Sequence, residues 1–431
     1  MKQLHAIVAV CISSISFTLS AAVDLVVDSE RLNQTMTAMT SFGGTAYGAS
    51  TRVAYSDANK EALIYLDGLM KKAGLTTHID AAGNLVGRRP GVANNLAPIL
   101  LGSHVDTVPN GGHFDGIVGV MSAIEVATIL QEQDVSLKHP AEFVVWANEE
   151  GGKTGSRAVA GEVASKEFGL PSLGKRSLEV GTGFLGGNLE NIADVKRSPG
   201  DIAAYLELHI EQGAILDRKA LEIGVVEGIV GIRRWNVTVR GTVNHAGTTP
   251  MDQRSDALYA AAQFMILVRE VITEVPGTQV ATVGRIKAFP GAPNVVPGEA
   301  VMSLEIRDLS MDKVSTLFER IQAASQKLAG ETGTSFLFEQ FYESLAAPTD
   351  ELLRKVIESS SDSLGLSHQR MPSGAGHDAQ SLGTICPIGM IFVPSRDGVS
   401  HSPKEYTSPE QITNGANVLL RTLIKLDSEL D

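Results

Sequence analysis

The stretch "HVDTVPNGGHFDG", His104 to Gly116, carries two histidines and two aspartates within thirteen residues, together with four glycines or prolines. Imidazole nitrogens and carboxylate oxygens are common protein ligands for Zn²⁺, Mn²⁺ and Co²⁺. The glycines and prolines favour turns over regular structure, so these ligand-type side chains are expected on a loop. A complete metal site then needs further ligands from other parts of the chain.

Groups of the same kind occur later in the sequence. The run "ANEEGG" contains an acidic pair, and four further histidines stand in short polar or glycine-rich contexts: Glu149 and Glu150, then His209, His245, His377 and His401. Each histidine alone is more simply a hydrogen-bonded loop residue, and the acidic pair alone is more simply a solvated turn. Their company with Asp106 and Asp115 instead indicates a metal centre.

Amide hydrolysis is the chemistry that such a centre would serve. The reaction needs a polarised carbonyl, an activated water and a proton carrier, and two divalent ions bridged by one carboxylate can supply the first two. Adjacent acids at a strand end can divide the remaining work, one facing the metal and the other facing the water. Imidazole and carboxylate ligands of this kind fit Zn, Mn or Co.

Short apolar strands alternate with helices around these residues. A helix is expected over residues 57–73, with Asp57 as its N-cap, and "APILLGSHVD" and "AEFVVWANEEGG" are expected strands on either side of another helix. This alternation predicts an α/β catalytic domain with a mixed, largely parallel sheet flanked by helices. Ligand sites in such sheets collect where strands end, and both His104 and the acidic pair follow strands.

The pattern changes from about Gly224. Strands such as "IRRWNVTVRGTV" and "AVMSLEIRD" alternate with two helices, which is typical of a small α+β unit close to the ferredoxin-like motif. Past about residue 340 the chain returns to helix, glycine-rich loop and apolar strand. We therefore predict a catalytic domain over residues 23–223 and 338–431, interrupted by an inserted dimerisation or lid domain over residues 224–337.

Residues 1–22 have the form of a secretory signal peptide, with one lysine, an apolar run and small residues at the end. A membrane anchor is the alternative, but serines interrupt the run and no stop-transfer flank follows. We expect an exported protein, periplasmic or secreted, without stable membrane insertion after signal cleavage. Only Cys386 would remain after cleavage, so neither an intrachain disulfide nor a thiolate metal site is expected.

Composition limits the partners and the size of the core. The net charge of −13, from 49 acidic and 36 basic residues, argues against nucleic acid as a partner, because phosphate binding needs a basic face. About 409 residues would remain after signal cleavage, which is more than one hydrophobic core usually serves and predicts two domains.

Seven motifs together resemble a known family: "GSHVDTVPNGGHFDG", "ANEEGG", "LELHIEQG", "NHAGTTPM", "NVVPGE", "SGAGHDA" and "VSHSPKE". In order and spacing they are similar to the amidohydrolase branch of the dinuclear aminoacylase/carboxypeptidase superfamily, which contains N-carbamoyl-L-amino-acid hydrolases, β-ureidopropionases and allantoate amidohydrolases. The similarity runs from about residue 30 to the C-terminus. Seven ordered motifs are a strong signal, whereas any one of them would be weak.

The resemblance implies a dinuclear metal centre with five protein ligands. Asp115 would bridge both ions. His104 and His209 would complete one metal site, and Glu150 and His401 would complete the other.

The resemblance implies catalytic roles for three further residues. Glu149 would be the general base, and Asp106 would orient the ligand His104. His245 would stabilise the oxyanion, reaching the site either across a dimer or by domain closure. A capping histidine before the helix near Ser255 is the alternative role for His245.

A substrate-binding set is implied in the same way. Arg307 and Asn294 would hold the substrate carboxylate, because a guanidinium can bind a carboxylate through two hydrogen bonds. Gln212 would contact the carbamoyl group, and the loop of Gly374, Gly376 and His377 would lie close to the substrate. A surface ion pair between Arg307 and Asp308, and glycines that serve only tight turns, are the alternatives.

We therefore expect a homodimeric, metal-dependent amidohydrolase that cleaves the C–N bond of an N-carbamoyl amino acid or an allantoate-like ureido acid and releases ammonia. An exported aminoacylase or dipeptidase of the same superfamily is one alternative, and a non-catalytic periplasmic solute-binding protein is another. The complete ligand set disfavours the binding protein. A signal peptide is unexpected in a branch associated mostly with cytosolic catabolism, so the physiological substrate stays open.

Overall fold

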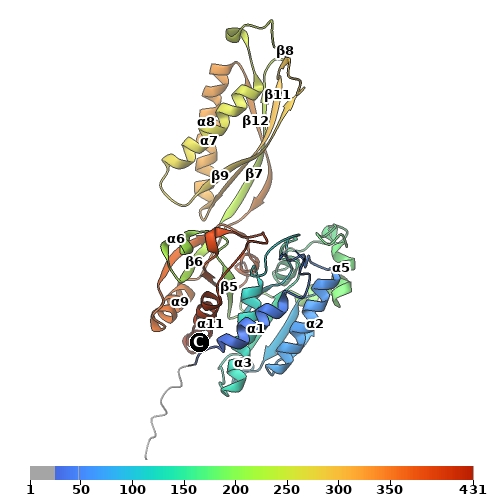
Figure 1. Ribbon diagram of the computed structural model, residues 1–431, viewed down its shortest axis with the longest axis vertical. Coiled ribbons are helices and arrows are strands. Elements are labelled where there is room, and N and C mark those ends of the chain that lie inside the picture. Colours follow the sequence, from blue (N-terminus) through green and yellow to red (C-terminus); the bar gives the residue numbers. More distant parts are fainter. Residues whose placement is uncertain (1–24, 47, 431) are drawn as a thin grey trace, which may run out of the picture.

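The computed structural model describes residues 25–46 and 48–430. The predicted signal peptide, residues 1–22, lies outside the described residues. The chain forms two lobes (Figure 1). The larger lobe contains the nine-stranded sheet and is called the catalytic lobe after the predicted catalytic domain. The elongated lobe contains the four-stranded sheet, extends away from the first, and is called the lid after the predicted inserted domain. Within the described part of the chain, no helix has both the length and the apolar character needed to cross a membrane.

The catalytic lobe is built on a nine-stranded mixed sheet with the strand order β1-β2-β4-β3-β5-β15-β6-β13, in which β14 also pairs with β6. The strands are β1 (Thr76–Ile79), β2 (Leu85–Arg89), β3 (Ile99–His104), β4 (Ala141–Trp146), β5 (Ala204–Ile210), β6 (Ile223–Ile229), β13 (Ala347–Pro348), β14 (His368–Ser373) and β15 (Ile388–Val393). Strands β4, β3, β5 and β15 run parallel at its centre, and antiparallel pairs flank them. Every position of these central strands is buried, as expected for parallel strands covered on both faces. The predicted mixed, largely parallel sheet is confirmed.

Helices cover both faces of this sheet and form two hydrophobic cores. The first core involves α1 (Ser29–Met39), α2 (Asp57–Lys72), α3 (Ile117–Glu132), α5 (Leu178–Leu185), α9 (Glu351–Ser363) and α11 (Pro409–Glu429). The second involves the short helices α4 (Thr154–Val159), α6 (Ile215–Lys219) and α10 (Asp378–Leu382). Short 3-10 helices occur at η1 (Ser165–Glu167), η2 (Leu189–Val195), η3 (Met251–Gln253) and η4 (Arg396–Gly398). The N-cap of α2 is Ser56 rather than the predicted Asp57, because the Ser56 side chain accepts from the amide of Asn59.

The lid contains a four-stranded antiparallel sheet in the order β12-β7-β11-β9. Its elements are β7 (Gly231–Arg240), β8 (Asn244–His245), α7 (Ala257–Glu274), β9 (Val280–Phe289), β10 (Val295–Val296), β11 (Glu299–Asp308), α8 (Met311–Thr332) and β12 (Ser335–Ser344). Both helices pack on one face of the sheet through a third core, and they leave the other face open (Figure 1). The element order and the strand order match the ferredoxin-like motif, which confirms the predicted α+β unit.

Strand pairing places both lid boundaries later than the predicted residues 224 and 337. Strand β6 pairs with β13, β14 and β15 and therefore belongs to the catalytic sheet, although the change of pattern near Gly224 was expected to open the lid. Its almost continuous burial is the pattern of a strand covered on both faces, whereas β7 alternates. At the other end, β12 pairs with β7 as far as Ser344. The lid thus spans residues 231–344.

Candidate active site

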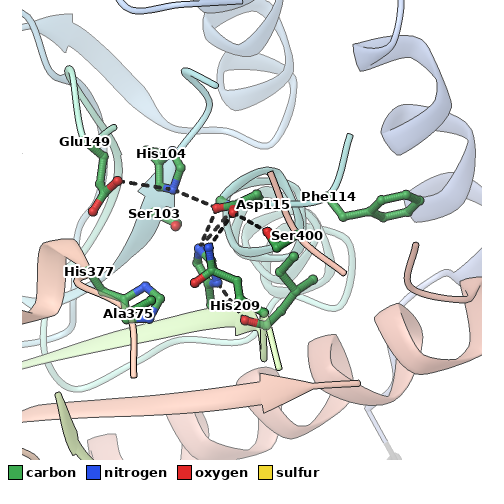
Figure 2. A network of polar contacts seen from close by, with 12 residues as sticks. Ser103, His104, Phe114, Asp115, Glu149, His209, Ala375, His377 and Ser400 are labelled. Carbon is green, nitrogen blue, oxygen red and sulfur yellow. Dashed lines mark hydrogen bonds and ion pairs between the residues drawn. The ribbon is translucent and has the colours of Figure 1, made fainter. Parts of the chain in front are cut away.

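The first group of ligand-type residues lies where two neighbouring central strands carry histidines. His104 ends β3, His209 lies near the end of β5, and Asp115 lies on the loop before α3. The Oδ1 atom of Asp115 is 3.4 Å from His104 Nε2 and 3.2 Å from His209 Nε2 (Figure 2). These three buried side chains form one set that could hold a metal ion.

The second group uses the other oxygen of the same aspartate. His401 Nε2 lies 3.3 Å from Asp115 Oδ2 and 3.4 Å from Glu150 Oε1. Asp115, Glu150 and His401 form a further set that could hold a metal ion. The structure therefore brings all five predicted metal ligands together in two sets that share Asp115.

The donor chemistry of both sets fits divalent ions. His104 Nδ1 lies 3.0 Å from the Asp106 carbonyl and His209 Nδ1 lies 2.8 Å from the Ile210 carbonyl, so each Nδ1–H donates and each Nε2 is the nitrogen left to bind an ion. Two ligand atoms that are each about 2.0–2.1 Å from one tetrahedral Zn²⁺ lie roughly 3.3 Å apart. The measured separations between Nε2 and carboxylate oxygen are close to that value.

A third set, Glu207, His209 and His377, has ligand-type atoms close together but is explained by hydrogen bonding. The Glu207 carboxylate accepts from Ser103 Oγ at 2.9 Å and from the amide of Ala379 at 3.1 Å. Because His209 Nδ1 already donates to a carbonyl, only its Nε2 can face a cation. The set therefore supports the ligand His209 rather than forming another metal site.

His377 does not lie on the open side of the centre. Its ring is 1% exposed and packs edge-on against His209, with 4.4 Å between ring centroids. Its Nε2 atom lies 2.8 Å from Ser373 Oγ. Burial, together with the nearby His209, holds the pKa of His377 well below its usual value. This placement puts His377 behind the ligand His209, and its contact with substrate stays a prediction.

Glu149 and Glu150 follow β4 and lie beside the two ligand sets. Glu149 Oε2 is 3.9 Å from His104 Nε2 (Figure 2). Burial raises the pKa of Glu149 to about 7. Burial and the charge of Asp115 raise the pKa of Glu150 to about 8. A carboxyl group with a pKa near neutrality is suited to accept and return a proton, which agrees with the predicted role of Glu149.

Asp106 acts differently from the prediction. Its carboxylate oxygens accept from the amides of Glu149 and Glu150, both at 3.2 Å, and lie no closer than 3.8 Å to His104 Nδ1. The backbone carbonyl of Asp106, not its side chain, accepts from His104. Asp106 therefore orients the acidic pair with its carboxylate and the histidine with its backbone carbonyl.

Glu405 is a functional residue that the sequence prediction missed. One of its oxygens accepts from the amides of Phe114 and Asp115 at 2.9 and 3.0 Å, and the other accepts from Ser400 Oγ and the amide of His401 at 2.8 and 3.2 Å. It thus joins the two loops that carry Asp115 and His401. Gly112 leaves room for it, since a Cβ there would lie 2.1 Å from Glu405 Oε1. The final glutamate of "VSHSPKE" was the available signal.

Arg52 is a second missed residue, beneath the turn that follows β3. Its fully buried guanidinium donates to the carbonyls of Val105 at 2.6 Å and Phe42 at 2.7 Å. Burial lowers the pKa of Arg52 to about 10, and the charge of Asp106 opposes this shift. Arg52 therefore stabilises the loop between His104 and Asp115.

Gln212 borders the second ligand set. Its Nε2 lies 2.6 Å from Asp115 Oδ2 and 3.5 Å from His401 Nε2, while its buried Oε1 has no partner among the described residues. Its backbone φ of 56° is uncommon for a residue with a side chain and is typical of functional sites. The predicted contact between Gln212 and a carbamoyl group fits this position.

The predicted substrate loop, residues 374–376, joins β14 to α10 on the surface. Gly374 has no described atom within 4 Å of a would-be Cβ, and for Gly376 the nearest atoms are 3.5 Å away or more. Neither glycine is therefore required by packing within the chain. The Gly374 carbonyl accepts from Arg307 Nη1 at 2.7 Å, so the lid contacts this loop.

The three predicted lid residues are not brought together. His245 and Asn294 are exposed near the tip, where β8 pairs with β10, whereas Arg307 lies near the base of β11 beside the catalytic lobe (Figure 1). The alternative pairing of Arg307 with Asp308 is wrong, because Arg307 pairs with Glu305 and Asp308 pairs with Lys313.

The alternative capping role of His245 is also wrong, because Asp256 caps α7. His245 Nδ1 instead accepts from the amides of Gly247 at 3.0 Å and Thr248 at 3.2 Å. The neutral ring therefore carries its proton on Nε2, and this N–H is a donor for a group outside the tip.

With this geometry described, comparison with known proteins identifies the family. Residues 100–425 match the model of peptidase family M20/M25/M40. The chain belongs to this family. It is 36% identical over 405 residues to the N-carbamoyl-L-amino acid amidohydrolase of Geobacillus stearothermophilus, covering 93% of this chain and 99% of that protein.

Two further known proteins show the same breadth of similarity to this chain. The allantoate amidohydrolase of Bacillus subtilis (strain 168) is 34% identical over 396 residues, which cover 89% of this chain and 94% of that protein. The crystal structure of a hydantoinase/carbamoylase family amidase from Burkholderia multivorans superimposes with a TM-score of 0.85 at 33% identity, covering 94% of this chain and all (100%) of that chain. The predicted family is confirmed, and the chain is a member of an amidohydrolase family.

Proposed function

We propose that this protein is a metal-dependent amidohydrolase that cleaves the C–N bond of an N-carbamoyl amino acid or a related ureido acid and releases ammonia. The observation that carries this proposal is the pair of ligand sets that share Asp115 beside Glu149. The names of the relatives, which act on N-carbamoyl-L-amino acids and allantoate, support the choice of substrate class.

The residues of the chain divide the work as follows. His104, His209 and Asp115 would hold one divalent ion, and Asp115, Glu150 and His401 would hold the other. When bound, these ions would polarise the scissile carbonyl and lower the pKa of water. Glu149 accepts the proton of the attacking water and returns it to the departing nitrogen, which leaves as ammonia.

Groups of the lid complete the substrate site in this proposal. Arg307 presents a guanidinium beside the Gly374 loop and binds the substrate carboxylate. His245 offers its Nε2–H to the carbonyl oxygen as negative charge develops there. Asn294 lies beside His245 at the tip, because the amide of Ala246 donates to its carbonyl. Arg307 and the tip residues come from opposite ends of the lid.

This separation supports a homodimer in which the tip of one lid serves the site of the other subunit. The edge strand β9 has an unpaired side in the described chain and carries exposed apolar residues, including Val280, Ile286 and Phe289. Two such edges can pair with each other and bury those side chains. Export stays a prediction that depends on residues 1–22.

The deciding experiment is an ammonia assay on a panel of N-carbamoyl amino acids and ureido acids, including allantoate and N-carbamoyl-β-alanine, alongside N-acetyl amino acids and dipeptides. Ammonia from a ureido acid supports the proposal, whereas hydrolysis of only acetyl or peptidyl substrates indicates an aminoacylase or a dipeptidase. Chelation should abolish the activity, and Zn²⁺, Mn²⁺ or Co²⁺ should restore it. Binding without turnover that survives chelation would indicate a solute-binding protein.

A further inference from the structure

Two arginines share one carboxylate on the open face of the lid sheet. Glu305 Oε1 accepts from Arg307 Nε at 2.6 Å, and Glu305 Oε2 accepts from Arg234 Nε at 2.5 Å. Arg234 lies directly opposite Glu305 in the pairing of β7 with β11, and Arg307 lies two residues further along β11. The three side chains therefore occupy the same face of the sheet.

Arg307 is held at two positions of its guanidinium. Its Nε–H is bound to Glu305, and one Nη1–H donates to the Gly374 carbonyl of the catalytic lobe at 2.7 Å. Nη2 has no partner among the described residues of the chain. The terminal fork of Nη1 and Nη2 therefore keeps free donors for a planar anion.

Glu305 is equipped to hold both cations. Partial burial acts to raise its pKa, but the hydrogen bonds and charges of Arg307 and Arg234 outweigh burial and lower the pKa of Glu305 below its usual value. The carboxylate is therefore ionised at neutral pH, and the three residues together carry one net positive charge. Arg234 is further fixed by its guanidinium lying over the Tyr342 ring, 4.7 Å from the centroid.

We propose that Glu305 is a positioning residue for substrate recognition, which occupies the Nε side of Arg307 so that only the terminal Nη fork meets the substrate carboxylate. This inference rests on the proposed function. A long arginine side chain that is already fixed loses less conformational freedom when it binds its anion. Glu305 would thus determine how well an acid is held, without touching the scissile bond.

The lid contains a matched control on its other face. Arg233 Nε donates to Glu343 Oε1 at 2.7 Å, and these residues are also direct partners on adjacent strands. Arg233 also donates to Ser315 of α8, so this pair lies on the helix side, away from Gly374. Glu343→Gln therefore removes a similar ion pair from the same domain without affecting Arg307.

The test compares Glu305→Gln and Glu343→Gln in the full-length, metal-loaded protein. Glutamine keeps the size of the side chain, but its amide NH₂ would face the N–H of one arginine, so one guanidinium loses its acceptor. For an N-carbamoyl amino acid we expect Glu305→Gln to raise KM about tenfold or more, with kcat changed by less than about threefold. Glu343→Gln should leave both constants unchanged.

A second substrate separates positioning from general stability. The carboxamide of the same N-carbamoyl amino acid lacks the carboxylate, so wild type and Glu305→Gln should have equal KM values for it. Equal KM values for the acid, an equal effect of Glu343→Gln, or an equal loss on acid and carboxamide would each overturn the inference. If Glu305→Gln does not fold, Glu305→Asp keeps the charge on a shorter side chain and should show a smaller increase in KM for the acid alone.

Calorimetric binding keeps this test separate from the proposed function. If the wild type releases no ammonia from any ureido acid, the proposed function is wrong, but the affinity of each variant for the acid can still be compared. Weaker binding of the acid by Glu305→Gln than by Glu343→Gln supports the role of Glu305, and equal affinities contradict it.

Discussion

The catalytic lobe and the lid hold their functional groups in opposite ways. In the catalytic lobe, His104, Asp115 and His209 are buried at 2%, 6% and 1% exposure, and each side chain has a partner from another strand or loop. In the lid, His245 and Asn294 are exposed at the tip and Arg307 lies at the base. The catalytic lobe brings its predicted metal ligands together, whereas the predicted functional residues of the lid lie apart from one another and are exposed at the tip.

The difference follows from the two sheets. The parallel strands β3 and β5 end at the same edge, so residues distant in sequence converge there without further help. In the antiparallel lid sheet, His245 follows the end of β7, whereas Arg307 of β11 pairs with Ile232 at the start of β7, so the two residues lie at opposite ends of the sheet. A mutation in the catalytic lobe should therefore act within its own subunit, and a mutation at the lid tip tests whether the tip serves its own subunit or a partner.

Glu149→Gln should have the largest effect and affect the catalytic lobe alone. The amide cannot accept the proton of water, whereas the ligand sets do not include Glu149, so kcat should fall by at least about 10³-fold with bound metal unchanged. Steady-state kinetics together with metal analysis measures both. Glu150→Gln is the matched control, because it should lose metal first. Near-normal turnover of Glu149→Gln would remove this residue from the mechanism.

His245→Ala tests the lid side of the comparison. Loss of an oxyanion donor should reduce kcat by roughly 10²–10³-fold while bound metal stays the same. If the tip serves the partner subunit, mixing this variant with His104→Ala should restore part of the activity, because one site of the heterodimer then has intact ligands and an intact His245. Mixtures that stay inactive at every ratio, with subunit exchange confirmed by native mass measurement, would instead indicate domain closure within one subunit.

The sequence predicted the catalytic lobe better than the lid for the same physical reason. Strand ends located His104 and Glu149, because side chains converge where neighbouring parallel strands end, and short polar motifs located Asp115 and His401 on the loops beyond. The role of the Asp106 carboxylate could not be read in this way, because the local path of the backbone after β3 decides whether a side chain or a backbone carbonyl reaches the histidine. The lid boundary near Gly224 was misplaced because β6 is a short buried strand whose pairing is long-range.

Glu405 shows the limit of reading the sequence by residue type. Its carboxylate joins two loops that lie almost 300 residues apart in the chain. Glu405 and its hydrogen-bond partner Phe114, for example, are separated by 291 residues in sequence. Spacing alone gives no reason to connect the last glutamate of "VSHSPKE" with "HFDG". The resemblance supplied roles for residues that touch metal or substrate, and the supporting carboxylate became visible only in the folded structure.

Glu405→Gln should lower metal affinity moderately, and it compares the metal centre within one subunit with the lid tip. The substitution replaces one carboxylate oxygen with an NH₂ group, which cannot accept a hydrogen bond from a backbone amide. The loops that carry Asp115 and His401 therefore lose a common hydrogen-bond acceptor. We expect metal affinity to fall by about 10- to 100-fold, as is typical for residues that orient metal ligands. Excess metal should then restore most of the activity, and mixing with His245→Ala should restore activity only through the intact partner site. Unchanged metal affinity would contradict this role.

The smallest expected effect, at most about tenfold per pH unit for each proton released, is the pH dependence of metal binding, and it distinguishes His401 in the catalytic lobe from His245 at the lid tip. In the metal-free protein, the hydrogen bond to Asp115 and the charge of Glu150 outweigh burial and raise the pKa of His401 to about 9. A protonated imidazole cannot bind a cation, and Glu150, whose pKa is raised to about 8, also holds a proton at pH 7, so an ion that enters this set must displace protons from both residues. Affinity should therefore rise from pH 6 towards pH 9, by at most about tenfold per pH unit for each proton released.

Calorimetric titration of the chelated protein in buffers of different ionisation enthalpy measures both the affinity and the protons released. His401→Ala should reduce the number of protons released, whereas His245→Ala, on the exposed tip, should leave it unchanged. Affinity independent of pH, or equal proton release by both variants, would show that His401 does not take part in metal binding.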